Sequence, residues 1–120
     1  MDLSIVVSAH NEEKNISSVV EDIISEMSMS GLDYEVLLVN DGSTDYTSVL
    51  CSQLKDKYNQ VSVINHYEHK GLSQALRTGF TSAQGTVIIT IDADGQYDSK
   101  DILALYDSLD IGKYDMVLGK

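Results

Sequence analysis

The sequence contains no proline, no tryptophan and a single cysteine among its 120 residues. Because Cys51 has no partner within the chain, an internal disulfide and a cysteine-based metal cluster are excluded, and a reducing compartment such as the cytoplasm is expected. The chain also lacks a run of about 18 apolar residues and the basic and apolar segments of a signal peptide. We therefore expect no membrane-spanning segment within these residues.

Basic residues are also scarce in this chain. Lys and Arg number 8 against 19 Asp and Glu, which gives a formal net charge of −11. Phosphate backbones repel such an acidic chain, so nucleic acid is not an expected partner. If the chain binds a diphosphate, a cation or local hydrogen-bond donors must reverse the sign of the potential at that site. Pairs of carboxylates that hold a cation are therefore a feature to look for.

Short apolar segments alternate along the chain with amphipathic segments of helical period. Segments rich in β-branched residues predict buried strands at 3–8, 34–39, 61–64 and 87–91, and a further strand begins at 116–118. Between them, apolar residues recur every three or four positions, which predicts helices. The clearest helix begins near Asn15 and carries its apolar residues at Ile16, Val19, Val20, Ile23, Ile24 and Met27.

This alternation predicts an α/β fold with a mostly parallel, Rossmann-like sheet and helices on both faces. The length and the 42% content of hydrophobic residues predict one folded domain over residues 1–120. In such sheets ligands bind at the C-terminal ends of the strands. Three polar clusters of the sequence fall at these ends, at residues 9–13, 40–45 and 92–96.

Finer predictions concern the second and the last helix. Ser43 or Thr44 is expected to cap the second helix, whose inner side would carry Val49, Leu50, Leu54 and Tyr58. Asp98 is expected to cap the last helix, whose inner side would carry Ile102, Leu103, Leu105 and Tyr106.

The strongest local signal is the run Asp92-Ala93-Asp94-Gly95-Gln96, directly after a predicted buried strand. Two carboxylates one residue apart and a nearby amide oxygen are hard ligands that suit Mg²⁺ or Mn²⁺, with positions left open for diphosphate oxygens. Such a metal ion would act as a Lewis acid toward a departing diphosphate. The same residues also suit a simple turn at the end of a strand. The spacing excludes a calcium loop of the EF-hand type, which needs Gly at its sixth position and Glu at its twelfth.

The other two clusters provide candidates for binding a nucleoside. Asp41 follows the second strand, where a carboxylate accepts hydrogen bonds from ribose hydroxyls or a base N–H. Turn formation or helix capping is the more common role of an aspartate at such a position. Small and polar residues lie at the end of the first strand: Ser8, Ala9, His10 and Glu12. Arg77, and less specifically Lys70, is a basic group suited to contact a diphosphate.

Several other chemistries lack their motifs. The sequence has no Gly-x-Gly-x-x-Gly and no Gly-Lys-Ser phosphate loop, which argues against dinucleotide dehydrogenases and NTPases. It has no Gly-x-Ser-x-Gly elbow, and Cys51 lies within a predicted helix without a basic neighbour, so nucleophilic hydrolysis is unsupported. His66 and His69 lack zinc-type spacing to Cys or carboxylate.

Taken together, four motifs in register resemble the family 2 inverting glycosyltransferases, most closely the dolichol-phosphate or polyprenol-phosphate mannosyltransferases. The family pattern Pro-Ala-Tyr-Asn-Glu-Glu appears as residues 8–13, and Asp-Asp-Gly-Ser-Thr-Asp appears as residues 40–45. Asn-x-Gly followed by Ala-Leu-Arg-x-Gly appears as residues 69–71 and 75–79. The run Asp-Ala-Asp-Gly-Gln matches residues 92–96 without change.

The resemblance implies a GT-A fold that binds a nucleoside-diphosphate sugar, such as GDP-mannose or a UDP-sugar, with Mg²⁺ or Mn²⁺. It implies a nucleoside pocket lined by Ser8, His10, Glu12, Val39 and Asp41, beside Ala9. It further implies nucleotide contacts from Asp92 and Ala93, with Arg77 near the base or diphosphate. The implied metal ligands are Asp92, Asp94 and Gln96.

The resemblance also implies a reaction, in which the acceptor attacks the anomeric carbon from the face opposite the diphosphate and inverts it. A polyprenyl phosphate in a membrane is one implied acceptor, and it needs no general base because it is already anionic. Relatives continue well beyond residue 120, so we expect the chain to be the donor-binding half. One alternative is a non-catalytic module that binds a nucleotide or a metal ion. A second is a nucleotidyltransferase, but such an enzyme usually needs a Gly-rich, basic phosphate loop near the first strand, and residues 9–14 do not provide one.

Three positions depart from the family pattern: Ser8 for Pro, His10 for Tyr and Asn40 for Asp. An imidazole can stack on a base as a phenol ring does, and Asp41 keeps the second carboxylate. We therefore expect an altered base preference rather than a loss of binding.

Overall fold

The computed structural model describes residues 1–95, 98–109 and 116–118. Its sheet consists of five strands in the order β3-β2-β1-β4-β5, and every neighbouring pair is parallel. The strands are β1 (Leu3–Ala9), β2 (Tyr34–Asp41), β3 (Val61–His66), β4 (Val87–Asp92) and β5 (Met116–Leu118). The predicted parallel α/β sheet is thus confirmed.

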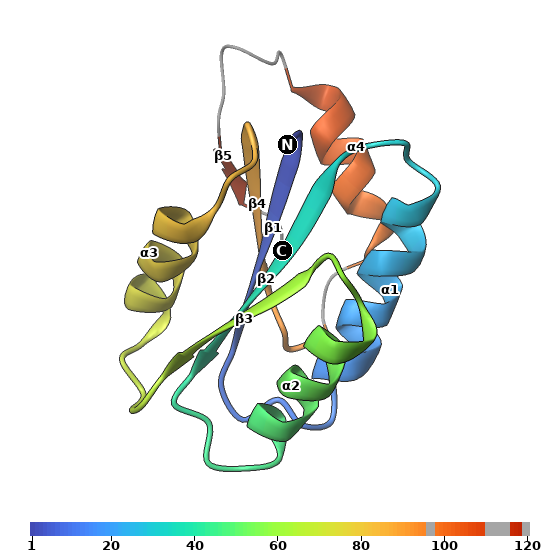
Figure 1. Cartoon of the computed structure of the whole chain (residues 1–120). Helices are drawn as coiled ribbons and strands as arrows, with labels where there is room; N and C mark the ends of the chain where they lie inside the picture. The colour runs from blue at the N-terminus through green and yellow to red at the C-terminus, as the bar shows by residue number, and fades with distance from the viewer. Residues whose placement is uncertain (96–97, 110–115, 119–120) are drawn as a thin grey trace.

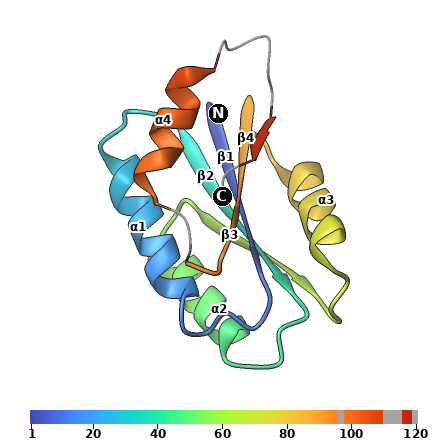
Figure 2. The same cartoon turned by 180° about the vertical axis from the view of Figure 1, so that it is seen from behind.

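Four helices cover the sheet unequally. They are α1 (Ile16–Ser28), α2 (Thr47–Lys57), α3 (Leu72–Ser82) and α4 (Lys100–Ser108). Figure 1 and the reverse view in Figure 2 both show α1, α2 and α4 on one face of the sheet and α3 alone on the other. None of the helices in the described part of the chain has the length and apolar character that crossing a membrane requires.

The two faces have separate hydrophobic cores. Every residue of β1 and β2 is buried, as expected for the central strands of a sheet covered on both sides. The larger core joins these strands to α1, α2 and α4 and includes Ile5, Ile23 and Ile102. The smaller core, under α3, consists of Val6, Leu37, Val39 and Ala75.

The strand order places a topological switch point beside β1. From β1 the chain passes through α1 to β2 and through α2 to β3, and then returns through α3 to β4 on the other side of β1. The connection from β1 to β2 runs through α1 on one face of the sheet, and the connection from β3 to β4 runs through α3 on the other. In parallel sheets, ligands bind beyond the C-terminal ends of the strands where the strand order reverses in this way. The fold therefore favours a site at this edge of the sheet.

Some finer expectations need correction. Strand β2 runs two residues further than predicted and includes Asn40 and Asp41. Val49 is 41% exposed, and the buried side of α2 instead carries Cys51 together with Thr47 and Leu54. Neither Ser43 nor Thr44 caps α2.

The N–H of Thr47 instead donates to the Asp45 carboxylate at 2.9 Å, which accounts for the start of α2. The expectations for α4 are confirmed. The N–H of Lys100 donates to Asp98 Oδ1 at 3.0 Å, and Ile102 is buried, with three further apolar side chains partly buried beside it.

Gly79 allows α3 to approach the sheet closely. A Cβ atom at this position would overlap with the Val6 side chain of β1. Gly in a helix otherwise costs up to about 1 kcal/mol relative to Ala, so its presence here is explained by packing rather than by helix propensity.

Replacing Gly79 by Ala should therefore destabilise the chain, by about 1–3 kcal/mol, because overpacking outweighs the gain in helix propensity. Urea unfolding followed by circular dichroism measures this free energy. Gln74→Ala, at an exposed position of α3, is the control and should change stability by less than about 0.5 kcal/mol. A stabilising effect of Gly79→Ala would show that α3 does not pack this closely on β1.

Candidate functional site

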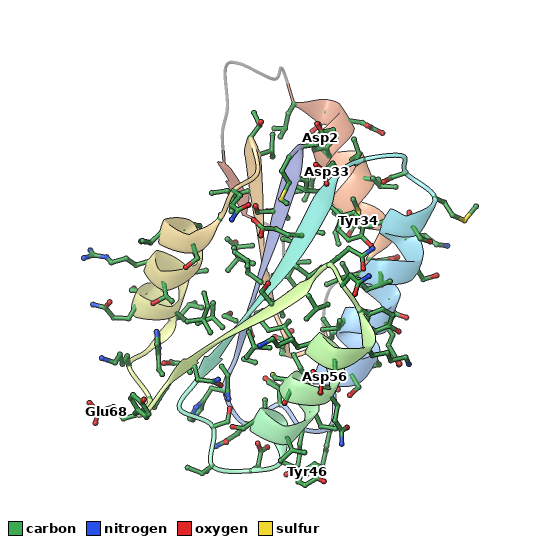
Figure 3. All side chains as sticks on the ribbon, viewed as in Figure 1. Asp2, Asp33, Tyr34, Tyr46, Asp56 and Glu68 are labelled. Carbon is green, nitrogen blue, oxygen red and sulfur yellow. The ribbon has the colours of Figure 1, made fainter. Side chains whose placement is uncertain are left out.

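A cavity of about 200 Å³ lies at the C-terminal edge of the sheet, where β1, β2 and β4 end beside the start of α3. Figure 3 shows Tyr46 and Glu68 at this end of the molecule and Asp2 and Asp33 at the opposite end. The cavity is lined by Ser8, Ala9, His10, Glu12, Asp41, His69, Leu72, Ala75 and Asp92. These residues come from four different segments of the chain.

Sheet register aligns the strand ends that form the cavity. Ser8 of β1 is paired with Val39 of β2 on one side and with Asp92 of β4 on the other. The Ala93 N–H donates to the Ser8 carbonyl at 3.0 Å, which continues this pairing one residue beyond β4. The first and third polar clusters of the sequence are thus neighbours in space.

The loop after β1 is fixed by the loop before α2. Asn11 has a positive φ of 54°, and its side-chain oxygen accepts the N–H of Thr44 at 2.8 Å. The Glu12 N–H donates to Thr47 Oγ1 at 2.9 Å. These bonds place His10 and Glu12 at the mouth of the cavity.

Asn40 and Asp41 point to opposite faces of the sheet because successive strand residues alternate. The Asn40 amide donates to Ser48 on the α2 side at 2.7 Å and to Asn65 of β3 at 2.9 Å. A carboxylate could not donate either bond. Asn40 therefore joins β2 to α2 and β3 through its amide, and it does not line the cavity. Asp41 is the one of the two that faces the site.

The Asp41 carboxylate is buried, and its side chain is only 4% exposed. Oδ1 accepts the Nδ1–H of His66 at 2.8 Å and the Lys70 N–H at 3.0 Å, and Oδ2 accepts the Gly71 N–H at 2.9 Å. The far nitrogen of His66, Nε2, lies 2.8 Å from the Thr78 hydroxyl on α3. One carboxylate therefore connects β2, β3, the loop before α3 and α3 itself.

These contacts determine the charge of Asp41. Burial by itself raises the pKa of a carboxyl, but the His66 hydrogen bond, the two backbone N–H groups and the nearby His69 together lower the pKa of Asp41 below its ordinary value. The group is thus a carboxylate in the folded chain at neutral pH.

His10 and His69 stack on each other beside Asp41. Their ring centroids are 3.8 Å apart with an interplanar angle of 14°. The Nδ1–H of His10 donates to the Asp41 carbonyl at 2.8 Å, and Nε2 of His69 lies 3.4 Å from Asp41 Oδ2. All three histidines of the chain thus surround one aspartate.

Of the predicted metal ligands, Asp92 is the last residue of β4 and Asp94 lies in the turn that follows, and both are exposed. Partial burial and the neighbouring Asp94 charge raise the pKa of Asp92. The Asn15 amide donates to the Asp94 carbonyl at 3.3 Å and lies against Gly95, whose φ is +80°. Gln96, the third predicted ligand, lies outside the described residues. Within the described ranges no three His, Cys, Asp or Glu side chains are grouped so that they alone could hold a metal ion.

Six of the nine predicted nucleotide-binding residues line the cavity: Ser8, Ala9, His10, Glu12, Asp41 and Asp92. Val39 is fully buried under α3, and the Ala93 side chain is buried in the larger core, so only their backbones could face a ligand. Arg77 lies on the outer side of α3, in a separate hollow with Leu76 and Phe80. Lys70 contributes its backbone N–H to Asp41.

Three residues that line the cavity were missed by the sequence reasoning: His69, Leu72 and Ala75. His69 occupies the Asn position of the Asn-x-Gly motif, which makes it a fourth departure from the family pattern. The unusual His at this position is the sequence feature that could have identified it as a site residue. Leu72 and Ala75 carry no chemical signal, because apolar helix residues ordinarily predict core.

Comparison with known proteins adds three kinds of likeness. The family model described as Glycosyl transferase family 2 matches residues 4–120. A dolichol-phosphate mannosyltransferase of Pyrococcus furiosus is 34% identical over 119 residues, covering 99% of this chain and 33% of that protein. The human dolichyl-phosphate beta-glucosyltransferase is 34% identical over 107 residues, covering 83% of this chain and 33% of that protein. The chain thus spans about a third of the length of these relatives.

Among solved structures, the mannosyltransferase PcManGT of Pyrobaculum calidifontis, in complex with GDP-Man and Mn²⁺, superposes with a TM-score of 0.70. It is 25% identical, and the match covers 85% of this chain and 30% of that chain. Staphylococcus aureus TarS 1-349, in complex with UDP-GlcNAc, has a TM-score of 0.68 at 24% identity, covering 89% of this chain and 31% of that one. These likenesses confirm the GT-A fold.

Replacing Asp41 by Asn should destabilise the chain by about 1–3 kcal/mol at neutral pH, because an amide cannot accept all the hydrogen bonds that the carboxylate accepts. Since the folded pKa is lowered, this stabilisation is fully present above the unfolded value of about 3.9 and is lost as pH falls through the folded value. Denaturant unfolding should therefore give a clear difference between wild type and variant above about pH 5, and a smaller one below about pH 4. Asp56→Asn, an exposed change on α2, is the control (Figure 3). If the difference in unfolding free energy between wild type and Asp41→Asn did not change with pH, the lowered pKa of Asp41 would be contradicted.

Proposed function

Because the chain belongs to glycosyl transferase family 2, we propose that it is the donor-binding part of a glycosyltransferase that moves a sugar from a nucleoside diphosphate to an acceptor with inversion. The observation that carries this proposal is the convergence of three separate motifs, at residues 8–12, 41 and 92, on one cavity at the switch point of the sheet. Ligands of parallel α/β folds bind at this edge.

The size of the cavity indicates which part of the donor it takes. Small-molecule pockets commonly measure about 300–1,000 Å³. The volume of about 200 Å³ between β1, β2 and α3 therefore suits a nucleoside, and the diphosphate and sugar would extend past Asp92. Leu72 and Ala75 offer an apolar wall, and Asp41 offers an acceptor for N–H or hydroxyl groups.

The turn after β4 has the donor chemistry for Mg²⁺ or Mn²⁺. Asp92 and Asp94 are two hard oxygen ligands, and Gln96 is a third in the sequence. Burial and the neighbouring Asp94 charge both raise the pKa of Asp92, and a bound cation would favour the ionised form against both effects. When bound, the ion supplies Lewis-acid stabilisation of charge on the diphosphate. Two carboxylates leave positions open for diphosphate oxygens.

The acceptor that the relatives support best is a polyprenyl phosphate. Several relatives are named for it, including a dodecaprenyl-phosphate galacturonate synthase and undecaprenyl-phosphate transferases. A phosphate acceptor is already anionic, so the described residues need not supply a general base. On this proposal the chain works in the cytoplasm, beside a membrane that contains the lipid acceptor.

Calorimetric titration tests the donor site. The chain is titrated with UDP-glucose and with GDP-mannose, each with and without Mn²⁺. One of the two donors should bind, and binding should weaken at least tenfold without the ion. The same loss is expected in Asp94→Asn, because that variant removes one of two carboxylate ligands.

Asp107→Asn, the same change at an exposed position on α4, is the matched control and should bind as the wild type does. Circular dichroism confirms folding of each sample. A folded chain that binds neither nucleotide sugar would overturn the proposal. An affinity that is the same with and without Mn²⁺, and the same in Asp94→Asn, would overturn the metal assignment alone.

A further inference from the structure

The fold brings two departures from the family motifs into direct contact. Position 10 carries His where the family pattern has Tyr, and position 69 carries His where it has Asn. The two lie 59 residues apart in sequence, on the loops after β1 and β3, yet their rings stack at 3.8 Å. Two separate motifs have therefore changed at the positions where they touch.

The hydrogen bonds of His10 place a proton on Nδ1. Nδ1 must carry a proton, because its partner at 2.8 Å is the Asp41 carbonyl, which can only accept. The other nitrogen, Nε2, lies 3.5 Å from the Asn11 side-chain nitrogen, a donor. A second proton on His10 would place two donors against each other.

His69 is the ring of the pair that lies beside the Asp41 carboxylate. Its Nε2 lies 3.4 Å from Oδ2 of Asp41, and its side chain is 54% exposed. A positive charge on His69 would interact with this carboxylate on one side and with the π face of His10 on the other. Positive charges on both rings at a centroid separation of 3.8 Å would repel each other.

The charges that face the pair come from every strand around it. Asp41 of β2, Glu12 after β1 and Asp92 of β4 contribute carboxylates, and His66 of β3 contacts the same Asp41. Glu68 and Lys70 flank His69, and both are exposed. Among the described residues that line the cavity there is no Lys or Arg, so the imidazoles are its only side chains that can become positive.

We propose that His69, held over the cavity by its stack on His10, gains a positive charge on protonation and thereby strengthens binding of the anionic donor as pH falls. This inference rests on the proposed donor site. The sign follows from linkage: a ligand that prefers the protonated pocket binds more tightly at lower pH and takes up a proton on binding. Imidazole is the side chain that changes its charge between about pH 5 and 8.

The test measures affinity for UDP-glucose and GDP-mannose by calorimetry between about pH 6 and pH 8 at fixed Mg²⁺. Nucleotide sugars are the right probes because their diphosphate has no ionisation in this range, whereas the terminal phosphate of a free nucleoside diphosphate does. Binding linked to one proton changes Kd by at most about tenfold per pH unit. We expect the wild type to bind about threefold to tenfold more tightly at the acid end.

Two variants locate the proton. His69→Asn should bind with an affinity that changes less than about twofold over this range. His10→Tyr keeps an aromatic ring under His69 and should retain the pH dependence. Both variants keep His66 and the carboxylates, so any pH dependence of metal binding is common to all three proteins and cancels in the comparison.

A second readout is the number of protons taken up, measured near pH 7 in two buffers of different ionisation enthalpy. The wild type should take up a fraction of a proton for each donor bound, and His69→Asn should take up less. Equal pH dependence in wild type and His69→Asn would overturn this inference and leave the donor site intact. Absence of donor binding at every pH by a folded chain would overturn both.

Discussion

The buried carboxylate of Asp41 is the constraint on which the arrangement of the site depends. A charge removed from water is tolerated only when donors replace its hydration, and here three donors and a nearby imidazole do so. The donors belong to two parts of the chain beyond β2, the end of β3 and the loop at residues 69–71. The end of β3, the loop at residues 69–71 and, through Thr78, helix α3 are therefore positioned by a single side chain.

The same constraint shapes the cavity. With its N-terminal end tied to Asp41 through the Lys70 and Gly71 N–H groups, α3 starts beside β1. Leu72 and Ala75 therefore form one wall of the cavity, and Ala75 also packs in the smaller core. Gly42 permits the approach, because a Cβ there would overlap with the backbone of Glu68 and His69, and its φ of +66° suits glycine. The motif Asp41-Gly42 thus combines an acceptor with the space that its donors need.

The sequence was sufficient to predict the parallel sheet, the four helices and the edge that holds the site, because buried strands and amphipathic helices leave strong periodic signals. It was insufficient where the outcome depends on tertiary contacts. Either Val49 or Cys51 could lie on the apolar side of a helix that also carries Leu54, and the packing of α2 against the sheet buries Cys51. The pairing of His10 with His69 depends on strand order, and so does the position of Arg77 outside the cavity. Gln96 remains a prediction, since it lies outside the described residues.

The carboxylates at the two ends of the cavity differ in whether hydrogen-bond donors balance their charge. Under the proposed function, this difference determines how a bound nucleotide sugar is oriented. At the β2 end, the charge of Asp41 is already matched by donors, so what remains there is a hydrogen-bond acceptor beside stacked rings, which suits a base or ribose. At the β4 end, Asp92 and Asp94 repel each other, which suits a cation and, with it, a diphosphate. The nucleoside would therefore lie toward β2 and the reacting sugar beyond β4. Under the proposed function, that direction would place the chemistry at the β4 side of the sheet.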